Sequence, residues 1–380
     1  MSKKFKTGVI GVGFIGAVHI EQLNRLGNVE VVALADDVNH KEKAAALCVA
    51  RSYACYKELI ENEELDCVHI CTPNNLHHEI ATYALQRGIH VVLEKPMTTT
   101  VEEAEELLAL AKDRGLVHAM NFNCRFYPMV YQMREMIKNG DIGEIFSIHG
   151  GYLQDWLFYD TDYNWRLEPE FSGESRAFSD IGSHWLDLVE FVTGQRVTEV
   201  LADFAIFHKT RKKPKKAIET YSGMALRPGD YEEVPINTED YATVLFHLDN
   251  GTHACCNISQ VFAGRKNQII ITISGSKCSF HWDSELSNEM WIGRRGTANG
   301  QLVKDPSILA PGAAKITSYP GGHVEGFPDT FKQNFKKIYA DIENGVDPNP
   351  DYANFSSGVR EMKVGEKIIQ SAKERRWISV

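Results

Sequence analysis

Gly11-Val12-Gly13-Phe14-Ile15-Gly16 is the stretch that decides the fold of this 380-residue chain. The apolar residues 5–10 before it are typical of a buried strand, and residues 17–26 after it carry apolar side chains at helical spacing. In such a turn the first glycine permits the tight bend, the second lets the backbone approach a pyrophosphate, and the third allows close helix–strand packing. N–H groups at the helix N-terminus bind phosphate oxygens. The stretch predicts a dinucleotide-binding site that includes Phe14 and Ile15; a glycine-rich turn without a ligand is the alternative.

An acidic pair lies where such a site needs it. Asp36 follows the second strand-like run, residues 29–35, and comes 36 − 16 = 20 residues after Gly16. A carboxylate about 20 residues after the glycines binds the hydroxyl groups of the adenosine ribose. Asp37 adds a second negative charge, which would repel a 2′-phosphate. We therefore expect NAD as the cofactor in preference to NADP.

The first third of the chain alternates strand and helix patterns. Further strands are expected at residues 67–71, 89–93 and 117–120, and further helices through residues 80–85 and after Thr100. This alternation is typical of βαβ units with a parallel sheet and helices on both faces. We predict an α/β fold here, a doubly wound Rossmann domain over residues 1–123.

After residue 123 the pattern changes. Strand patterns follow one another without intervening helices at residues 145–155, 197–208, 241–248, 253–260 and 268–274, and Asp249-Asn250-Gly251 is a hairpin signal. Helices are expected at residues 129–138, 331–342 and 358–375. Consecutive strands indicate an α+β domain with a large, mainly antiparallel open sheet. We assign residues 124–380 to this substrate-binding domain and allow for the C-terminal helix packing back on the first domain.

Composition narrows the class of protein. Lys and Arg total 41 against 51 Asp and Glu, a formal charge of 41 − 51 = −10, which argues against nucleic-acid binding because phosphate backbones select basic surfaces. No apolar run reaches the roughly 20 residues of a membrane helix, and residues 1–6 lack a signal core. The eight cysteines form no Cys-x-x-Cys pair. We expect a reduced, cytoplasmic enzyme without a membrane or nucleic-acid partner.

One basic segment, residues 209–216, departs from this acidic composition (Lys-Thr-Arg-Lys-Lys-Pro-Lys-Lys). It could be a nuclear-localisation or polyanion-binding patch. In a chain of charge −10 we favour a solvated loop that leaves a strand, with Pro214 preventing further pairing.

Polar residues follow the third expected strand. Thr72-Pro73-Asn74-Asn75 and His77 come directly after it, and in an open parallel sheet the binding crevice lies outside the carboxyl ends of the strands. We expect this segment to line the cofactor. His77 and His78 could also be metal ligands, but no partner at zinc-like spacing follows them, so we expect no metal site.

Two further motifs carry ionisable side chains. Glu94-Lys95-Pro96 ends the fourth strand, where either the strand has reached solvent or Lys95 enters the crevice. Asp180 and His184 are four residues apart, so on a helix they share one face. A His–carboxylate pair is either a structural hydrogen bond or an acid/base unit with an orienting partner. Each motif taken alone leaves both interpretations open.

In order and spacing these motifs together resemble the Gfo/Idh/MocA family of nicotinamide-dependent sugar and cyclitol oxidoreductases. The resemblance covers nearly the whole chain: the Gly11 turn, Thr72-Pro73-Asn74, Glu94-Lys95-Pro96, Asn123-Cys124-Arg125-Phe126-Tyr127-Pro128, Trp165-Arg166, Asp180 to His184, and the ending Trp377-Ile378-Ser379-Val380. Residues 152–187 look most like the branch that acts on pyranosides and anhydrosugars, such as levoglucosan and glucoside 3-dehydrogenases.

The resemblance implies a dehydrogenase. His184 would be the general base for a hydroxyl of a sugar, glycoside, anhydrosugar or cyclitol, Lys95 would stabilise the reacting oxygen, and Asp180 would orient His184 or the sugar. A cis peptide before Pro96 is also implied. The implied cofactor contacts add Glu94, Lys95, Asn123, Trp165 and Arg166 to those above.

Polar groups beside an aromatic surface suit a polyhydroxylated ring. We therefore expect substrate contacts from Lys95, Asn123, Arg125, Tyr152, Gln154, Asp155, Trp165, Arg166, Asp180, His184 and His323. Tyr152 and Trp165 could equally be core residues. His323 lies in a Pro/Gly-rich region, residues 311–328, which is expected to be a flexible loop that closes over the site or an ordinary surface loop.

Two other functions stay open. One is a glycosidase that retains NAD and cleaves by transient oxidation and elimination; the other is a non-catalytic nucleotide or sugar sensor. The combined presence of Lys95, Asp180 and His184 argues against a sensor. The expected partner is a small-molecule carbohydrate or polyol, and the resemblance implies a homo-oligomer, a dimer or tetramer paired through the open sheets.

Overall fold

The structure, a computed structural model, describes residues 4–215 and 228–380, so Lys216 of the basic segment and the first three residues lie outside the described residues. The chain divides into two compact units. Unit 1 comprises Met1–Phe126 and Phe327–Met362, and unit 2 comprises Tyr127–Gly326 and Lys363–Val380. This division differs from a single cut after residue 123, because a second segment of chain returns to unit 1.

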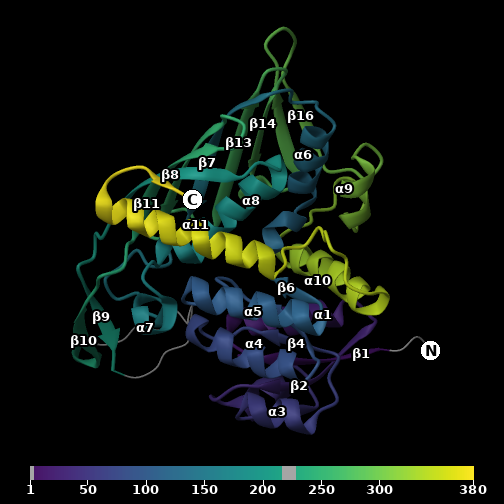
Figure 1. The fold of residues 1–380 in the computed structure, drawn as a ribbon, viewed down its shortest axis with the longest axis vertical. Helices are drawn as coiled ribbons and strands as arrows, with labels where there is room; N and C mark the ends of the chain where they lie inside the picture. The colour runs from purple at the N-terminus through teal and green to yellow at the C-terminus, as the bar shows by residue number, and fades with distance from the viewer. Residues whose placement is uncertain (1–3, 216–227) are drawn as a thin grey trace. The chain divides into compact units, whose positions relative to one another are not determined.

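A six-stranded parallel sheet forms the centre of unit 1, in the order β3-β2-β1-β4-β5-β6. Its strands are β1 (Phe5–Ile10), β2 (Val29–Ala35), β3 (Arg51–Tyr53), β4 (Cys67–Ile70), β5 (His90–Leu93) and β6 (His118–Met120). The intervening helices are α1 (Phe14–Asn24), α2 (His40–Ala46), α3 (Tyr56–Asn62), α4 (His77–Gln86) and α5 (Val101–Arg114), several of which are labelled over the strands in Figure 1. This strand order belongs to dinucleotide-binding folds and confirms the predicted Rossmann domain.

Helix α10 (Phe327–Asn344) completes unit 1. It packs against α1, where Arg25 forms a 2.8 Å ion pair with Asp329. The apolar stripe that it buries consists of Phe331, Phe335, Ile338 and Tyr339. Helix α11 (Phe355–Glu374) starts in unit 1, and its residues from Lys363 onward belong to unit 2. The amphipathic face of α10 is therefore the physical reason why the chain returns to the first unit.

Nine strands form the sheet of unit 2, in the order β16-β15-β14-β13-β7-β12-β11-β8-β17. They are β7 (Ile145–Leu153), β8 (Val197–Ala205), β11 (Tyr241–Leu248), β12 (His253–Ser259), β13 (Gln268–Gly275), β14 (Ser279–Asp283), β15 (Glu289–Gly293), β16 (Gly300–Val303) and β17 (Ile378–Ser379). Within the described strands of this sheet, β7 and β12 pair in parallel and the other neighbours are antiparallel. The mainly antiparallel sheet is confirmed, as is the hairpin of β11 and β12, in which Gly251 has φ +77°.

Helices α6 (Pro128–Lys138), α8 (Ser183–Thr193) and α9 (Pro311–Ile316) also belong to unit 2. Helix α8 packs on β7 and β13, where the indole Nε1 of Trp185 donates a 2.9 Å hydrogen bond to the carbonyl oxygen of Ile270. A Cβ on Gly150 would lie 2.6 Å from that Nε1. The glycine therefore allows α8 to approach the sheet closely, and this contact fixes the helix that carries His184.

The basic segment forms a strand, which corrects the prediction of a loop. β9 (Thr210–Pro214) pairs antiparallel with β10 (Tyr231–Pro235), and Pro214 stands at the last pair of that ladder. Lys212 lies opposite Glu233 in the same ladder. The lysine side chains form ion pairs outside the ladder, Lys212 with Asp160 at 2.8 Å and Lys213 with Glu168 at 3.0 Å, so the segment is paired both through its backbone and through its charges.

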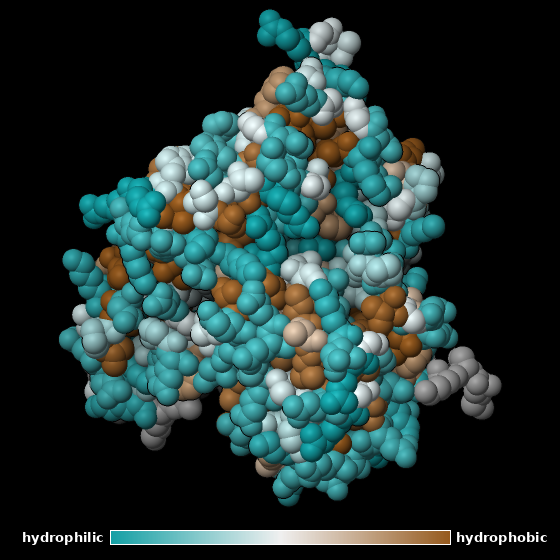
Figure 2. All heavy atoms as spheres, viewed as in Figure 1, coloured by the Kyte–Doolittle hydropathy of each residue, from teal (hydrophilic) through white to brown (hydrophobic). Residues whose placement is uncertain are grey.

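The surface drawn in Figure 2 is mainly hydrophilic, with apolar residues in separate patches. In unit 1 a large apolar core cluster includes Val68 and Ile70 of β4 together with Ile80 and Leu85 of α4. Across the residues that the structure describes, no helix combines the length and the apolarity needed to cross a bilayer.

Candidate active site

The glycine-rich turn joins β1 to α1. Gly11 has φ +82°, and a Cβ on it would lie 2.7 Å from the main-chain nitrogen of Thr72, so a larger residue would be both strained and crowded. A Cβ on Gly16 would lie 2.2 Å from the carbonyl oxygen of Gly11. A Cβ on Gly13, in contrast, would meet nothing within 4 Å among the described residues. The turn is thus closed on two sides and open beside Gly13.

This open turn fits a pyrophosphate. Gly13 is the N-cap of α1 and, as a glycine, makes no side-chain capping hydrogen bond, and the N-terminus of a helix is where main-chain N–H groups bind phosphate oxygens. On the neighbouring loop, Thr72 Oγ1 and Asn75 Oδ1 are buried and have no hydrogen-bond partner within the described part of the chain. Such atoms are rare in proteins, and a polar ligand would supply the partners. The residues present therefore fit a dinucleotide.

Asp36 lies at the carboxyl end of β2, beside this turn. Its Oδ2 accepts a 2.6 Å hydrogen bond from the amide of Val12, and its Oδ1 accepts a 2.9 Å bond from the amide of Val38. Lys43 places its Nζ 2.8 Å from Oδ1. The carboxylate is held next to the turn, where a ribose-binding group belongs, whereas the Asp37 side chain is exposed.

His77 is completely buried at the start of α4. Its Nδ1 lies 3.0 Å from the carbonyl oxygen of Pro96, and its Nε2 lies 3.0 Å from that of Thr72. Burial lowers the pKa of His77. Both ring nitrogens contact main-chain oxygens, and a contact between His77 and the cofactor stays a prediction. His77 joins the Thr72 loop to the segment that follows β5, where the Lys95–Pro96 peptide is cis as the resemblance implied.

Glu94 at the end of β5 is buried and strongly hydrogen bonded. Its Oε1 accepts from His19 Nε2 at 3.0 Å and from Asn121 Nδ2 at 2.5 Å, while its Oε2 accepts from the amide of Lys95 at 3.2 Å. Burial raises the pKa of Glu94, but the hydrogen bond and charge of His19, with Lys95 and Asn121, outweigh it and hold the pKa at about 2. Glu94 is therefore an anion that fixes the main chain of Lys95. The sequence predicted a cofactor contact for it.

A chain of buried polar side chains extends from Glu94 into unit 1. His19 Nδ1 lies 2.9 Å from His69 Nδ1, and His69 Nε2 lies 3.1 Å from the hydroxyl of Tyr339. That hydroxyl is 2.6 Å from Thr7 Oγ1. Burial, followed by the charge of His19, lowers the pKa of His69 well below its ordinary value. Sequence reasoning missed this network because each pair of partners is far apart along the chain; a histidine on the apolar face of α1 was the available signal.

In unit 2, Asp180 lies in a π-helical turn (Phe178–Gly182) and His184 lies in the first turn of α8. The four-residue spacing predicted an α-helical turn, in which the main chain bonds residue i to residue i+4. The structure has a π turn, in which residue i bonds to residue i+5. A Cβ on Gly182 would lie 2.6 Å from the ring of Phe178, so the glycine permits the wider turn to close. His184 is buried, and its ring centroid is 6.0 Å from that of Tyr152.

Both oxygens of Asp180 accept hydrogen bonds. Arg166 Nε donates to Oδ1 at 3.1 Å, and Gln260 Nε2 donates to Oδ2 at 2.9 Å. The Arg166 guanidinium lies over the ring of Trp165, 4.4 Å from its centroid. The structure therefore brings the predicted residues Trp165, Arg166 and Asp180 together in one cluster of unit 2. Gln260 was not predicted.

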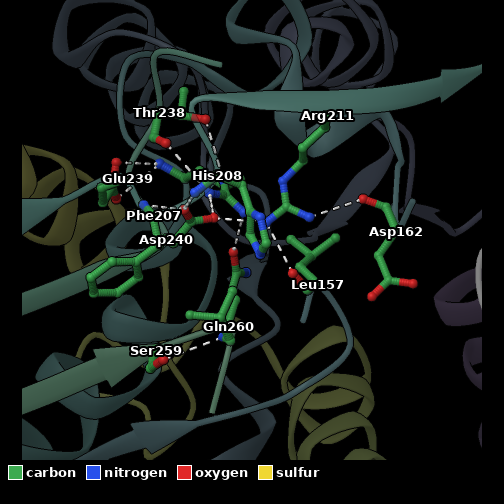
Figure 3. Close-up of polar contacts among 12 residues, drawn as sticks. Leu157, Asp162, Phe207, His208, Arg211, Thr238, Glu239, Asp240, Ser259 and Gln260 are labelled. Carbon is green, nitrogen blue, oxygen red and sulfur yellow. Dashed lines mark hydrogen bonds and ion pairs between the residues drawn. The ribbon is translucent and has the colours of Figure 1, made fainter. Parts of the chain in front are cut away.

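A buried charged cluster adjoins Gln260 (Figure 3). Arg176 Nη2 and Arg211 Nη2 both donate to Oδ1 of Asp240, at 2.5 Å and 2.8 Å. Oδ2 of Asp240 accepts from the amides of Phe207 and His208. Arg211 also donates to main-chain oxygens of Leu157, Tyr159 and Asp162. The cluster therefore holds the segment between β7 and Trp165 in place. No short sequence motif predicts this cluster.

The other predicted substrate residues near β7 contact each other. Tyr152 Oη and Gln154 Nε2 both donate to Asn267 Oδ1 at 2.6 Å. Both side chains are buried. The Asp155 carboxylate accepts instead from Lys266 Nζ at 2.7 Å, so its charge is paired at the surface.

Asn123 and Arg125 are buried in unit 1. Asn123 Nδ2 donates to Thr330 Oγ1 of α10 at 2.7 Å, and Arg125 Nη1 donates to the carbonyl oxygen of Asp351 at 3.4 Å. These contacts tie the 123–126 segment to the returning part of the chain.

The region around His323 is anchored by buried contacts at its base, and its role as a loop that closes over the site stays a prediction. Its first residues form α9, and α10 begins at Phe327. Lys304 and Glu325 are buried and form a 2.6 Å ion pair, and Lys304 Nζ also donates to the carbonyl oxygen of His323 at 2.6 Å. The His323 side chain itself is exposed. A buried ion pair with this many hydrogen bonds orders the loop that carries it.

These features define an oxidoreductase with an NAD-binding Rossmann domain and a second, α+β domain. Residues 5–122 match the model described as "Oxidoreductase family, NAD-binding Rossmann fold", and residues 130–281 match the Gfo/Idh/MocA C-terminal domain. The chain belongs to the Gfo/Idh/MocA family of oxidoreductases, as its motifs predicted.

Relatives match over the full length. The chain is 26% identical to levoglucosan dehydrogenase from Pseudarthrobacter phenanthrenivorans, over 100% of this chain and 98% of that protein. An oxidoreductase domain protein from Kribbella flavida superposes with a TM-score of 0.89 at 28% identity, with 100% of both chains covered. Levoglucosan dehydrogenase in complex with NADH, at 24% identity and a TM-score of 0.87 over 100% of this chain and 99% of that one, shares the fold.

Proposed function

We propose that the protein is an NAD-dependent dehydrogenase that oxidises a hydroxyl carbon of a sugar or polyol, with His184 as general base and Lys95 and Asp180 beside the reacting oxygen. The observation that carries the proposal is in unit 2. There a buried imidazole follows, by four residues, a carboxylate fixed at both oxygens by Arg166 and Gln260. Such a held acid/base pair in an NAD-binding oxidoreductase suits proton removal from an alcohol.

Each side chain has a separate task. A ring nitrogen of His184 takes the hydroxyl proton, because imidazole exchanges protons close to neutral pH. The Lys95 ammonium at Nζ donates a hydrogen bond to the oxygen as negative charge develops on it. Asp180 keeps its negative charge and orients the substrate hydroxyl or His184. NAD, when bound, supplies the hydride acceptor.

The cofactor would be held by the residues of unit 1. Amides at the start of α1 would bind the pyrophosphate, and Asp36 would bind the hydroxyl groups of the adenosine ribose. The buried hydroxyl of Thr72 would donate to or accept from the same ligand, and the buried amide oxygen of Asn75 would accept from it. Further predicted cofactor contacts are Asp37, Pro73, Asn74, His77, Glu94, Lys95 and Asn123 of unit 1, with Trp165 and Arg166 of unit 2.

We propose a pyranoside or anhydrosugar as the substrate, with cyclitols as the next class. The support is the full-length similarity to levoglucosan dehydrogenase together with the polar and aromatic set Tyr152, Gln154 and Trp165. A carbohydrate ring offers hydroxyl groups to polar side chains and an apolar face to aromatic side chains.

The test is NADH formation with levoglucosan, glucose, methyl glucosides and inositols, measured for the wild type and for His184→Ala. We expect reduction of NAD with at least one of them and a loss of about 10²- to 10⁴-fold in turnover in the variant, with NAD affinity retained. Wild-type turnover in the variant would remove His184 from the mechanism. Release of the aglycone from a nitrophenyl glucoside without net NADH would identify the NAD-retaining glycosidase instead.

A further inference from the structure

The contact between Gln260 and Asp180 has one possible orientation. Gln260 is completely buried immediately after β12, and its Oε1 lies 3.2 Å from Arg176 Nη1. A guanidinium can only donate hydrogen bonds, so the amide oxygen of Gln260 must face Arg176. The amide nitrogen must therefore face Oδ2 of Asp180, 2.9 Å away.

Arg176 is itself immobilised. It is buried, its Nη2 donates to Asp240 at 2.5 Å, and its Nε donates to Thr238 Oγ1 at 3.2 Å. The main chain of Gln260 is fixed by the same aspartate, since its amide donates to the carbonyl oxygen of Asp240 at 3.1 Å. The glutamine is thus held at both its backbone and its amide oxygen (Figure 3).

We propose that Gln260 is the positioning residue that sets the plane of the Asp180 carboxylate and keeps it an acceptor toward the protein, so that Asp180 orients the reaction and carries no proton. The inference rests on the proposed function of Asp180. Its basis is the continuous series of hydrogen bonds that joins Asp240, Arg176, Gln260 and Asp180. Arg176 donates to both Asp240 and Gln260, and Gln260 donates to Asp180, so no hydrogen bond in the series can be reversed.

A merely structural role predicts a different pattern, and the chain offers a matched control. Gln268 in β13 is also a buried glutamine, and its Nε2 donates to an aspartate, Asp283 Oδ2, at 2.6 Å. Gln260→Met and Gln268→Met each remove a buried amide that donates to an aspartate of unit 2. Only the first removes a donor from Asp180.

The experiment compares Gln260→Met, Gln268→Met, Asp180→Ala and the double variant Asp180→Ala with Gln260→Met, using NADH formation from levoglucosan and myo-inositol. We expect Gln260→Met to lower kcat about 10- to 100-fold, because hydrogen bonds to charged groups are the strong ones, and to leave the Kd of NAD unchanged. Gln268→Met should leave kcat within about twofold. In the Asp180→Ala background Gln260→Met should have no further effect.

Gln260→Glu gives a second signature. At neutral pH the introduced carboxylate faces Asp180 as a second acceptor and repels it, so activity should fall below that of Gln260→Met. As the pH falls, the introduced group gains a proton that it can donate to Asp180, and the activity relative to wild type should rise. Loss of an ordinary packing residue would give no such rise.

The outcomes separate the two proposals. Full activity in Asp180→Ala would overturn the role of Asp180 in the proposed function, and the positioning role with it. Loss of activity in Asp180→Ala together with normal kcat in Gln260→Met would overturn the positioning role alone. A crystal structure of Gln260→Met tests the positioning role without a substrate. We expect the Asp180 carboxylate to rotate in this variant, and an unchanged carboxylate would contradict the inference.

Discussion

Replacing His19 tests how unit 1 keeps a buried carboxylate charged. In the folded protein the pKa of Glu94 is about 2 rather than 4.5, which at 1.36 kcal/mol per pH unit corresponds to about 3 kcal/mol of stability. Because the folded pKa is the lower one, this stability is present above pH 4.5 and is lost as the pH falls toward 2. His19→Leu removes the donor to Oε1 and leaves the carboxylate buried. We expect the free energy of unfolding at pH 7 to fall by about 3 kcal/mol, on the scale measured for broken buried ion pairs.

Urea unfolding followed by circular dichroism at pH 7 and pH 4 measures this effect. At pH 4 the difference in the free energy of unfolding between His19→Leu and wild type should shrink. The Glu94 carboxyl of the variant takes up a proton as the pH falls, so the variant then buries less uncompensated charge. Glu94→Gln provides the control, since in that background His19→Leu should cost clearly less than in the wild type. His19→Gln should restore most of the loss through its Nε2 donor. An equal penalty at both pH values and in both backgrounds would refute the role given to the His19–Glu94 contact.

Four further substitutions have effects that follow from the geometry. Gly16→Ala should fail to fold or lose several kcal/mol in the free energy of unfolding, because its Cβ would lie 2.2 Å from a carbonyl oxygen. Gly13→Ala should unfold like wild type but bind NAD more weakly, which calorimetry measures. Asp36→Ala should weaken NAD binding and narrow the preference over NADP; wild-type rates with NADP equal to those with NAD would contradict the assignment of Asp36. Asp240→Asn should lower the free energy of unfolding by about 3–5 kcal/mol in urea denaturation, because two buried guanidinium groups would lose their shared anion; a loss below 1 kcal/mol would show that the cluster is not held by that charge.

The sequence predicted the elements whose signals are local. The glycine turn, the alternation of strands and helices, and the hairpin at Gly251 each follow from neighbouring residues, and the structure contains them. Short elements were missed for a physical reason: β3 has three residues, none of them buried, so no alternating pattern can appear in it. The predicted boundary at residue 123 allowed only for the C-terminal helix to return to the first domain, whereas the structure groups residues 327–362 with unit 1. The pattern of an amphipathic helix shows that one face is buried but does not show which part of the chain covers it.

The candidate site shows the same limit. Lys95, Asp180 and His184 lie in recognisable motifs, but the groups that hold their neighbourhood do not. Gln260 reaches Asp180 across 80 positions of sequence, and Asn121 is fixed by Asn334 through a 2.9 Å hydrogen bond. The four-residue spacing of Asp180 and His184 also concealed a π turn, since the same spacing is compatible with both helix types.

The return of residues 327–362 to unit 1 sets the order in which the protein can finish folding. Residues 1–126 are synthesised before residues 327–362. The hydrogen bond from the amide of Met120 to the carbonyl oxygen of Ala353, and the one between Thr7 and Tyr339, cannot form until the later residues are present. Unit 2 is nearly complete by residue 326 and lacks little more than the end of α11 and β17. The cofactor-binding unit, although synthesised first, must therefore mature last, and a fragment cut after residue 126 would expose the sheet that α10 covers.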